Sequence, residues 1–324
     1  MDTRLSWLAG CDEPWTRYRT RLDLLGEAPE SPIVRGEHQA MLDHPQVRSL
    51  IQSALSWGEQ SLKRHNDAAH PLVAISTLAD FGLYVGDPGV NEITQLLLAH
   101  QSAQGAFQSP LQIGQAYGGT GCMQWAWLAC DTPVLLYALL SFGLGDDPRL
   151  GLAAGHLVSL CAENGYRCVA APELGQFHGP GRRSDPCPIA NVYALKALSR
   201  LPNAQELPCA QRAAEMLLGH WQQRAEHKYY LFGMGSDFRK LKYPFIWYDL
   251  LHVTEVLSRC PPAAGDPRLS EMLDLLAGKA GAEGRYTPES VWKAWEGWDF
   301  GQKKAPSPWL TLLAHRILAR AGRG

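Results

Sequence analysis

Cysteines and acids recur just before three apolar segments of the chain, and a further cysteine lies in the connection between the first two segments. Thiolate and carboxylate groups are ligands that zinc accepts, usually three or four of them in a tetrahedral array. Helix N-termini also favour the thiolate over the thiol. The pattern therefore predicts a zinc site, whose candidate ligands are Cys130, Cys168, Asp185, Cys187 and Asp249.

Two imidazoles lie close to these residues in the sequence. His178 follows Cys168 in the same connection, and His252 stands three residues after Asp249. The alternative to a metal site is that the cysteines fill space in the core, where free cysteines are common. The chain has no Cys-x-x-Cys pair that would decide between the two.

Aromatic and basic residues concentrate in the long connections that carry these cysteines. Aromatic side chains in such loops can line an apolar ligand pocket, or they can pack the loops onto the body of the protein. Neighbouring arginines could hold a diphosphate, although surface solvation also explains them. The candidate ligand-binding residues are Trp125, Trp127, Arg182, Arg183, Tyr248 and Trp295.

Four prolines, spaced by about 60 residues, reveal an internal repeat: Pro88, Pro148, Pro208 and Pro267. Three of them follow an Asp, and Asp-Pro is a helix-start signal because the carboxylate caps free N–H groups while Pro loses no hydrogen bond there. In three repeats a glycine stands 17 residues after the proline and is followed by an aromatic residue. The spacing predicts a helix from each proline to that glycine.

Apolar helices are expected to alternate with these, over 72–81, 134–142, 189–201, 250–257 and 309–318. They are apolar on most faces, which indicates burial, whereas the helices after the prolines carry a polar stripe. Each repeat is then a hairpin of one inner and one outer helix. The period predicts an all-α fold, an α/α toroid closed by about five to six hairpins.

The whole chain, 1–324, is predicted to be a single domain. Residues 1–70 form an atypical cap or first repeat, with helices over 15–25 and 32–42, and regular repeats cover 71–324. No segment carries a strand pattern. Connections from outer to inner helices exceed 20 residues, and all of them are expected at one end of the ring, where function is expected as well.

Composition narrows the classes of function. Lys and Arg total 30 against 32 for Asp and Glu, so the charge balance gives no case for a nucleic-acid partner. No apolar run is long enough to span a bilayer. Eight cysteines without an export signal predict a cytoplasmic protein with free thiols.

The repeat, with the stop Gln101-Ser-Ala-Gln-Gly-Ala-Phe107, resembles the repeats of terpenoid cyclases and protein prenyltransferases over about residues 70–320. Those families share an α/α toroid. Squalene-type cyclases protonate an alkene with an Asp-x-Asp-Asp motif, which this chain lacks, because Asp146-Asp147 stands in a short turn after Leu144-Gly145.

Protein prenyltransferase β-subunits bind zinc with Asp-x-Cys on one inner helix and a His on the next. Asp185-Pro-Cys187 resembles that pair, whereas Asp249 stands at the position of the His. The resemblance implies zinc, a hydrophobic and isoprenoid ligand, and an unknown partner subunit. It leaves open whether the chain is an enzyme.

Two alternatives remain at this stage. One is a non-catalytic binding or scaffold protein with structural zinc. The other is a carbohydrate-active α/α-barrel enzyme, which would use a pair of the acids Asp131, Asp185, Asp237, Asp249 and Asp299. Zinc-dependent thioether cyclases also use such a barrel, but their Trp-Cys and Cys-His-Gly signatures are absent.

Overall fold

The structure is a computed structural model that describes residues 3–323 except 178, 180, 205–206 and 230–231. Within that part of the chain the fold is mostly helical, with thirteen α-helices. They are α1 (Thr3–Ala9), α2 (Pro14–Asp23), α3 (Pro32–Asp43), α4 (Pro45–Leu55), α5 (Pro71–Phe81), α6 (Val90–Leu98), α7 (Thr132–Ser141), α8 (Pro148–Ser159), α9 (Pro188–Leu198), α10 (Pro208–Gln222), α11 (Leu250–Leu257), α12 (Pro267–Ala277) and α13 (Pro308–Arg320).

The Asp-Pro signals start two helices as predicted. Asp147 accepts a hydrogen bond from Arg149 N at 2.9 Å at the start of α8, and Asp266 accepts one from Arg268 N at 2.8 Å at the start of α12. The first repeat differs, because the Asp87 carboxylate accepts instead from Tyr84 N, and α6 begins later, after Gly89. Such caps stabilise a helix by about 1 kcal/mol.

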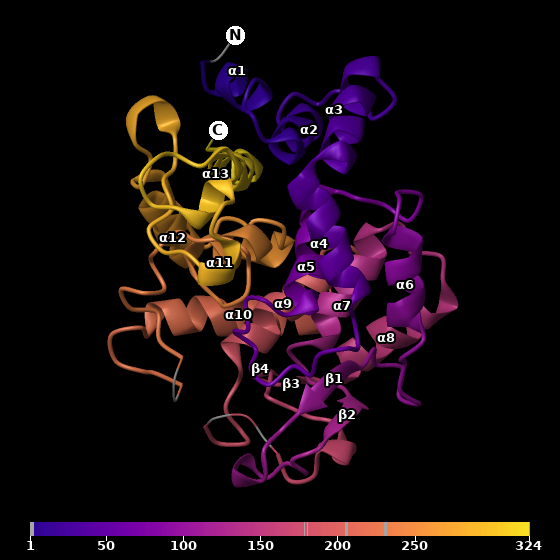
Figure 1. The fold of residues 1–324 in the computed structure, drawn as a ribbon. Coiled ribbons are helices and arrows are strands. Elements are labelled where there is room, and N and C mark those ends of the chain that lie inside the picture. The colour runs from indigo at the N-terminus through magenta and orange to yellow at the C-terminus, as the bar shows by residue number, and fades with distance from the viewer. Residues whose placement is uncertain (1–2, 178, 180, 205–206, 230–231, 324) are drawn as a thin grey trace.

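Two short hairpins lie in the long connections, where no strand was predicted. They are β1 (Ser109–Gln112) with β2 (Met123–Ala126), and β3 (Cys161–Ala162) with β4 (Gly165–Tyr166), both antiparallel. β1 also pairs with Leu62, whose N–H donates to Pro110 O at 2.6 Å. Strands of two to four residues are too short to show the alternation of apolar and polar residues by which a strand is predicted. Figure 1 shows the hairpins at the opposite end of the molecule from the chain termini.

Six helices, which we term the inner helices, follow one another in a cyclic order of contacts. α2 contacts α5, α5 contacts α7, α7 contacts α9, α9 contacts α11, α11 contacts α13, and α13 contacts α2. The helices α3, α4, α8, α10 and α12 pack against the inner helices α2, α5, α7, α9 and α11 respectively, and α12 also contacts α13. Every residue of α5, α9 and α11 is buried, as the apolar pattern predicted.

Each inner helix also contributes a charged or phenolic group to the interior. One cluster joins Asp80 to Lys196 at 2.9 Å and to the Tyr137 hydroxyl at 2.6 Å. Another places Arg316 between Asp23 at 2.9 Å and Glu255 at 3.1 Å. The residues, in chain order, are Asp23 (α2), Asp80 (α5), Tyr137 (α7), Lys196 (α9), Glu255 (α11) and Arg316 (α13).

The repeated glycines lie beyond the helices rather than at their ends. α6, α8 and α12 stop several residues before Gly105, Gly165 and Gly284, which all have positive φ. A Cβ at Gly105 would lie 2.7 Å from the Leu152 carbonyl oxygen, so glycine lets the chain pass close to α8. The glycines therefore shape turns and do not stop helices.

The aromatic residue after each glycine is tied to the next inner helix, and the two partners are always 25 residues apart. The Thr132 hydroxyl donates to Phe107 O at 2.6 Å, Asn191 bonds both the N–H and the carbonyl of Tyr166, and Tyr286 N donates to the Thr311 hydroxyl at 2.9 Å. These backbone anchors fix both ends of each long connection relative to the inner helices.

Candidate metal centre

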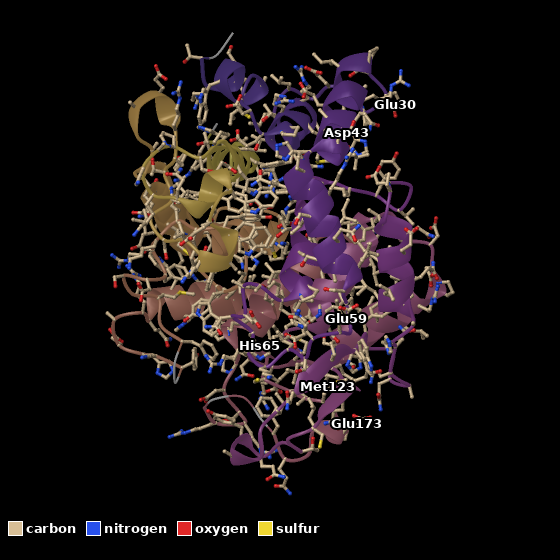
Figure 2. All side chains as sticks on the ribbon, in the orientation of Figure 1. Glu30, Asp43, Glu59, His65, Met123 and Glu173 are labelled. Carbon is tan, nitrogen blue, oxygen red and sulfur yellow. The ribbon has the colours of Figure 1, made fainter. Side chains whose placement is uncertain are left out.

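Three potential ligands meet at the start of α7. The ligand atoms of His65, Cys130 and Asp131 all lie within 4.8 Å of one another, so this group could hold a metal ion. His65 comes from the segment between α4 and α5, which pairs with β1 through Leu62. In Figure 2 His65 lies on the side of the helices that also carries Met123 of β2.

The contacts orient the His65 ring. Its Nδ1 lies 3.0 Å from Asp131 Oδ1, and Cys130 Sγ lies 3.5 Å from Nε2 and 3.6 Å from Nδ1. If Nδ1 carries the proton and donates to Asp131, then the lone pair of Nε2 is left to bind a metal ion. Metal-binding histidines are commonly held in this way by a carboxylate. The second oxygen of Asp131, Oδ2, is buried and has no hydrogen-bond partner among the described residues.

Two further thiols border the same site. Cys187 lies just before α9, and its N–H donates to Tyr166 O at 2.8 Å. Cys168 lies on the neighbouring segment as a diagonal neighbour of Cys187, because Arg167 and Pro186 form an antiparallel bridge. The Cys168 and Cys187 thiols are hydrogen-bonded to each other, and both interact electrostatically with Cys130.

The thiols differ in acidity because their surroundings differ. Burial raises the pKa of Cys130 to about 12, against the opposing effect of His65. The hydrogen bond from Cys187 lowers the pKa of Cys168 to about 7, helped by His65 and by Gly179 N–H. Burial lowers the pKa of His65, but Cys130 and Asp131 outweigh it and raise that pKa well above the usual range. A metal ion would have to displace these protons.

A cavity of about 510 Å³ opens beside these groups. Its wall includes three cysteines and His65, and most of the remaining wall is apolar or glycine. The apolar and aromatic lining comes from Leu62, Leu111, Ile113, Tyr117, Leu128, Phe177, Ile189, Phe232 and Trp247. Lys63 and Arg64 also line it, and no ion pair of theirs occurs with the described residues. The cavity thus combines an apolar wall, soft metal ligands and two cations.

The sequence-predicted ligands separate into two groups. Cys130, Cys168 and Cys187 come together at this cavity. Asp185 lies in a turn, where its carboxylate accepts a hydrogen bond from Arg182 N at 3.1 Å. Asp249 is fully buried at the start of α11, where it accepts a hydrogen bond from His252 N at 3.0 Å. Neither acid belongs to the group formed by His65, Cys130 and Asp131.

Asp249 gives a pH-dependent prediction. Burial raises the pKa of its carboxyl from 3.8 to about 7, so the folded chain holds this proton more tightly than the unfolded chain does. Stability is therefore lost as the pH rises from about 4 to about 7. In metal-free protein, Asp249→Asn should raise the free energy of unfolding at pH 8 by about 1–3 kcal/mol and leave it nearly unchanged at pH 4. Asn also keeps the helix cap.

Urea unfolding at the two pH values measures this effect. Asp237→Asn, at a carboxylate whose side chain is 88% exposed, is the matched control and should change little at either pH. A variant Asp249→Asn that is less stable than the parent at pH 8 would contradict the prediction.

The predicted ligand-binding residues lie outside the lining of the 510 Å³ cavity. Trp125 stacks on His100 with 3.4 Å between ring centroids, and Trp127 packs its edge on His156. Trp295 is buried and its indole N–H donates to Ala68 O, while the Tyr248 hydroxyl donates to Gly233 O. Arg182 and Arg183 are exposed in the turn that contains Asp185.

His65 and Asp131 are the members of this group that the predicted ligand set lacked, and His65 is the one that sequence reasoning missed altogether. It stands in the irregular region before residue 70, where no repeat sets the register. Its position could have indicated a ligand, because His65 stands shortly before an apolar helix, as Cys130 and Cys187 stand shortly before the next two. Of the other candidates, His178 falls outside the described residues, and His252 packs between Tyr193 and Phe245.

Comparisons with known proteins add little to this geometry. No protein-family model and no curated protein matches the chain. A crystal structure of a protein from Actinoplanes is similar at a TM-score of 0.46 and 14% identity, over 95% of this chain and 89% of that one. Similarity at that level assigns neither a fold family nor a function. No helix among the described residues has the length and hydropathy needed to cross a membrane.

Proposed function

We propose that this chain is an α/α-toroid protein that binds zinc and a hydrophobic ligand of isoprenoid type at the mouth of the ring. The observation that carries the proposal is the position of His65, Cys130 and Asp131 beside a largely apolar cavity of about 510 Å³. Cavities of this size and lining commonly bind small apolar molecules.

The cyclic contacts of the inner helices support the toroid. A ring of hairpins requires the last inner helix to meet the first, and α13 does contact α2. The bond from Arg316 of α13 to Asp23 of α2 spans this junction. Three of the four repeat prolines, Pro148, Pro208 and Pro267, also start helices that pack against the inner helices.

The donor set fits zinc. Sulfur and imidazole ligands favour zinc over magnesium or calcium, which prefer oxygen. We assign Cys130 and His65 Nε2 as ligands, with Cys168 and Cys187 as the remaining sulfur donors and Asp131 as the carboxylate that orients His65. A zinc ion there would supply a Lewis acid or would hold a thiolate at the cavity wall.

The ligand is expected to remain at the mouth of the ring. The interior holds the buried clusters around Asp80 and Arg316, which a hydrocarbon chain would have to displace. At the cavity, the apolar wall suits the body of an isoprenoid. Lys63 and Arg64 suit an anionic head group.

A non-catalytic protein with structural zinc is the second candidate, and the three sulfurs favour it. Structural zinc sites are closed by four protein ligands, whereas catalytic sites keep one position open. Three cysteines and one histidine would close the site. A site that uses only two of the sulfurs would leave a position for a substrate.

Zinc content and ligand binding test the proposal together. The purified chain, reconstituted with zinc sulfate and dialysed, should hold one zinc per chain by elemental analysis. Ile113→Trp, which fills the cavity wall, should then weaken the binding of farnesol or its diphosphate at least about tenfold in a calorimetric titration and leave the zinc content unchanged.

The matched control is Ile33→Trp, because Ile33 is 48% exposed and distant in sequence from the cavity lining. Equal binding of the ligand by the Ile113→Trp and Ile33→Trp variants would show that the cavity is not the ligand-binding site. A chain that holds no metal after reconstitution would contradict the zinc site.

A further inference from the structure

We infer that Cys168 and Cys187 form an oxidation site, at which a hydroperoxide converts the two thiols into a disulfide inside the cavity. The inference goes beyond the proposed function. It requires neither zinc nor the isoprenoid ligand, because it rests on the placement of two sulfurs.

The backbone holds the two residues in register. Arg167 and Pro186 form an antiparallel bridge, and Cys187 N donates to Tyr166 O at 2.8 Å. Residues 168 and 187 follow the bridge on their respective segments, so their side chains share one face as diagonal neighbours. The two thiols are hydrogen-bonded, so their sulfurs are neighbours on the cavity wall. A disulfide forms once the two segments draw together to a Cα spacing of about 4.4–6.8 Å.

The pair is accessible to a small oxidant. Both cysteines line the cavity of about 510 Å³, and Cys168 is the more exposed of the two. Gly179 packs directly on the Cys168 sulfur, where a Cβ would lie 2.1 Å from Sγ. That contact holds the sulfur in place on the cavity side.

The chemistry is balanced with hydrogen peroxide as oxidant. The Cys168 thiolate attacks one peroxide oxygen, the O–O bond breaks, and the released hydroxide takes a proton to become water. The Cys187 sulfur then attacks the resulting sulfenic acid, and the S–O bond breaks as a second water leaves with the thiol proton. Two thiols lose two electrons, and one peroxide is reduced to two water molecules.

The other cysteines provide the competing outcomes. Cys122 is exposed and could pair only between chains or with an external thiol. Cys161 lies near Cys209, with its sulfur 3.8 Å from Cys209 O, but neither residue lines the cavity. Each alternative gives a different cross-linked peptide pair.

The test uses the full chain, reduced and freed of metal with a chelator, and then treated with one equivalent of hydrogen peroxide. Alkylation and peptide mass spectrometry should show two of the eight thiols lost, a mass lower by about 2 Da, and a Cys168–Cys187 peptide pair. Cys187→Ser should lose this pair and leave Cys168 as a sulfenic acid. Cys260→Ser, at a buried cysteine outside the cavity lining, should still form it.

The inference is overturned if all eight thiols survive, or if the first pair to form involves Cys122, Cys130, Cys161 or Cys209. Zinc added before the peroxide separates this result from the proposed function. If zinc slows disulfide formation, both sulfurs are zinc ligands. An unchanged rate would leave the oxidation site intact and would contradict their role as zinc ligands.

Discussion

His65→Ala should lower the affinity of the chain for zinc by at least about 100-fold, whereas Asp131→Asn should lower it by about 10-fold. The first variant removes a ligand. The second leaves the ring in place but exchanges the carboxylate, whose Oδ1 lies 3.0 Å from Nδ1, for a neutral amide. Both affinities should fall as the pH is lowered, because zinc competes with protons on His65 and on the thiols.

Competition with a chromophoric chelator measures these affinities. His227→Ala, at an exposed histidine, is the control and should bind zinc like the parent. Cobalt substitution gives a second readout, because thiolate ligands produce a charge-transfer band that should survive in Asp131→Asn. Equal losses in His65→Ala and Asp131→Asn would make Asp131 a direct ligand, and no loss in either would exclude this centre.

Glu255→Ala should lower the free energy of unfolding by about 3–5 kcal/mol, because it leaves buried arginine charges without their carboxylate partner. The Glu255 carboxylate pairs with Arg259 at 2.9 Å, Arg316 at 3.1 Å and Arg320 at 3.0 Å. These arginines hold its pKa well below the usual range although burial opposes them. Its stabilising contribution is therefore present above the unfolded-state pKa and is lost as the pH falls towards the folded-state value.

Urea unfolding at pH 7 measures the loss. Glu215→Ala is the matched control, since Glu215 pairs with Arg268 at 2.7 Å but its side chain is 65% exposed. Exposed pairs contribute about 0–1 kcal/mol. If both variants lose the same small amount, the cluster does not hold α11, α13 and α2 together.

The helices were predictable because proline and apolar patterns are local. The Asp-Pro pairs fixed the starts of α8 and α12, and the apolar runs fixed the inner helices to within a few residues. The interior charges were missed, although each stands as one polar residue within an apolar run. Asp80, Lys196 and Glu255 are examples, and their partners come from other helices.

Only those residues of the site that lie within the repeat could be predicted from the sequence. Cys130 and Cys187 precede inner helices in register, so the repeat places them at one end. His65 is 66 residues before Asp131 and outside the repeat, and only tertiary structure brings it to the metal centre. Asp185 matched a family motif and Asp249 stood in place of the motif's histidine, but a position in a motif does not fix where a carboxylate points.

The 25-residue anchors make the packing of the inner helices independent of the length and sequence of the long connections. Because Phe107, Tyr166 and Tyr286 are each tied to the inner helix that follows, the long connections before α7, α9 and α13 begin and end at fixed points. Doubling the length of such a tethered segment costs only about 0.6 kcal/mol in closure entropy. The anchored segments can therefore change in length and sequence while the packing of the helices stays the same. Selectivity for the ligand can evolve or be engineered at this end of the protein without a change of fold.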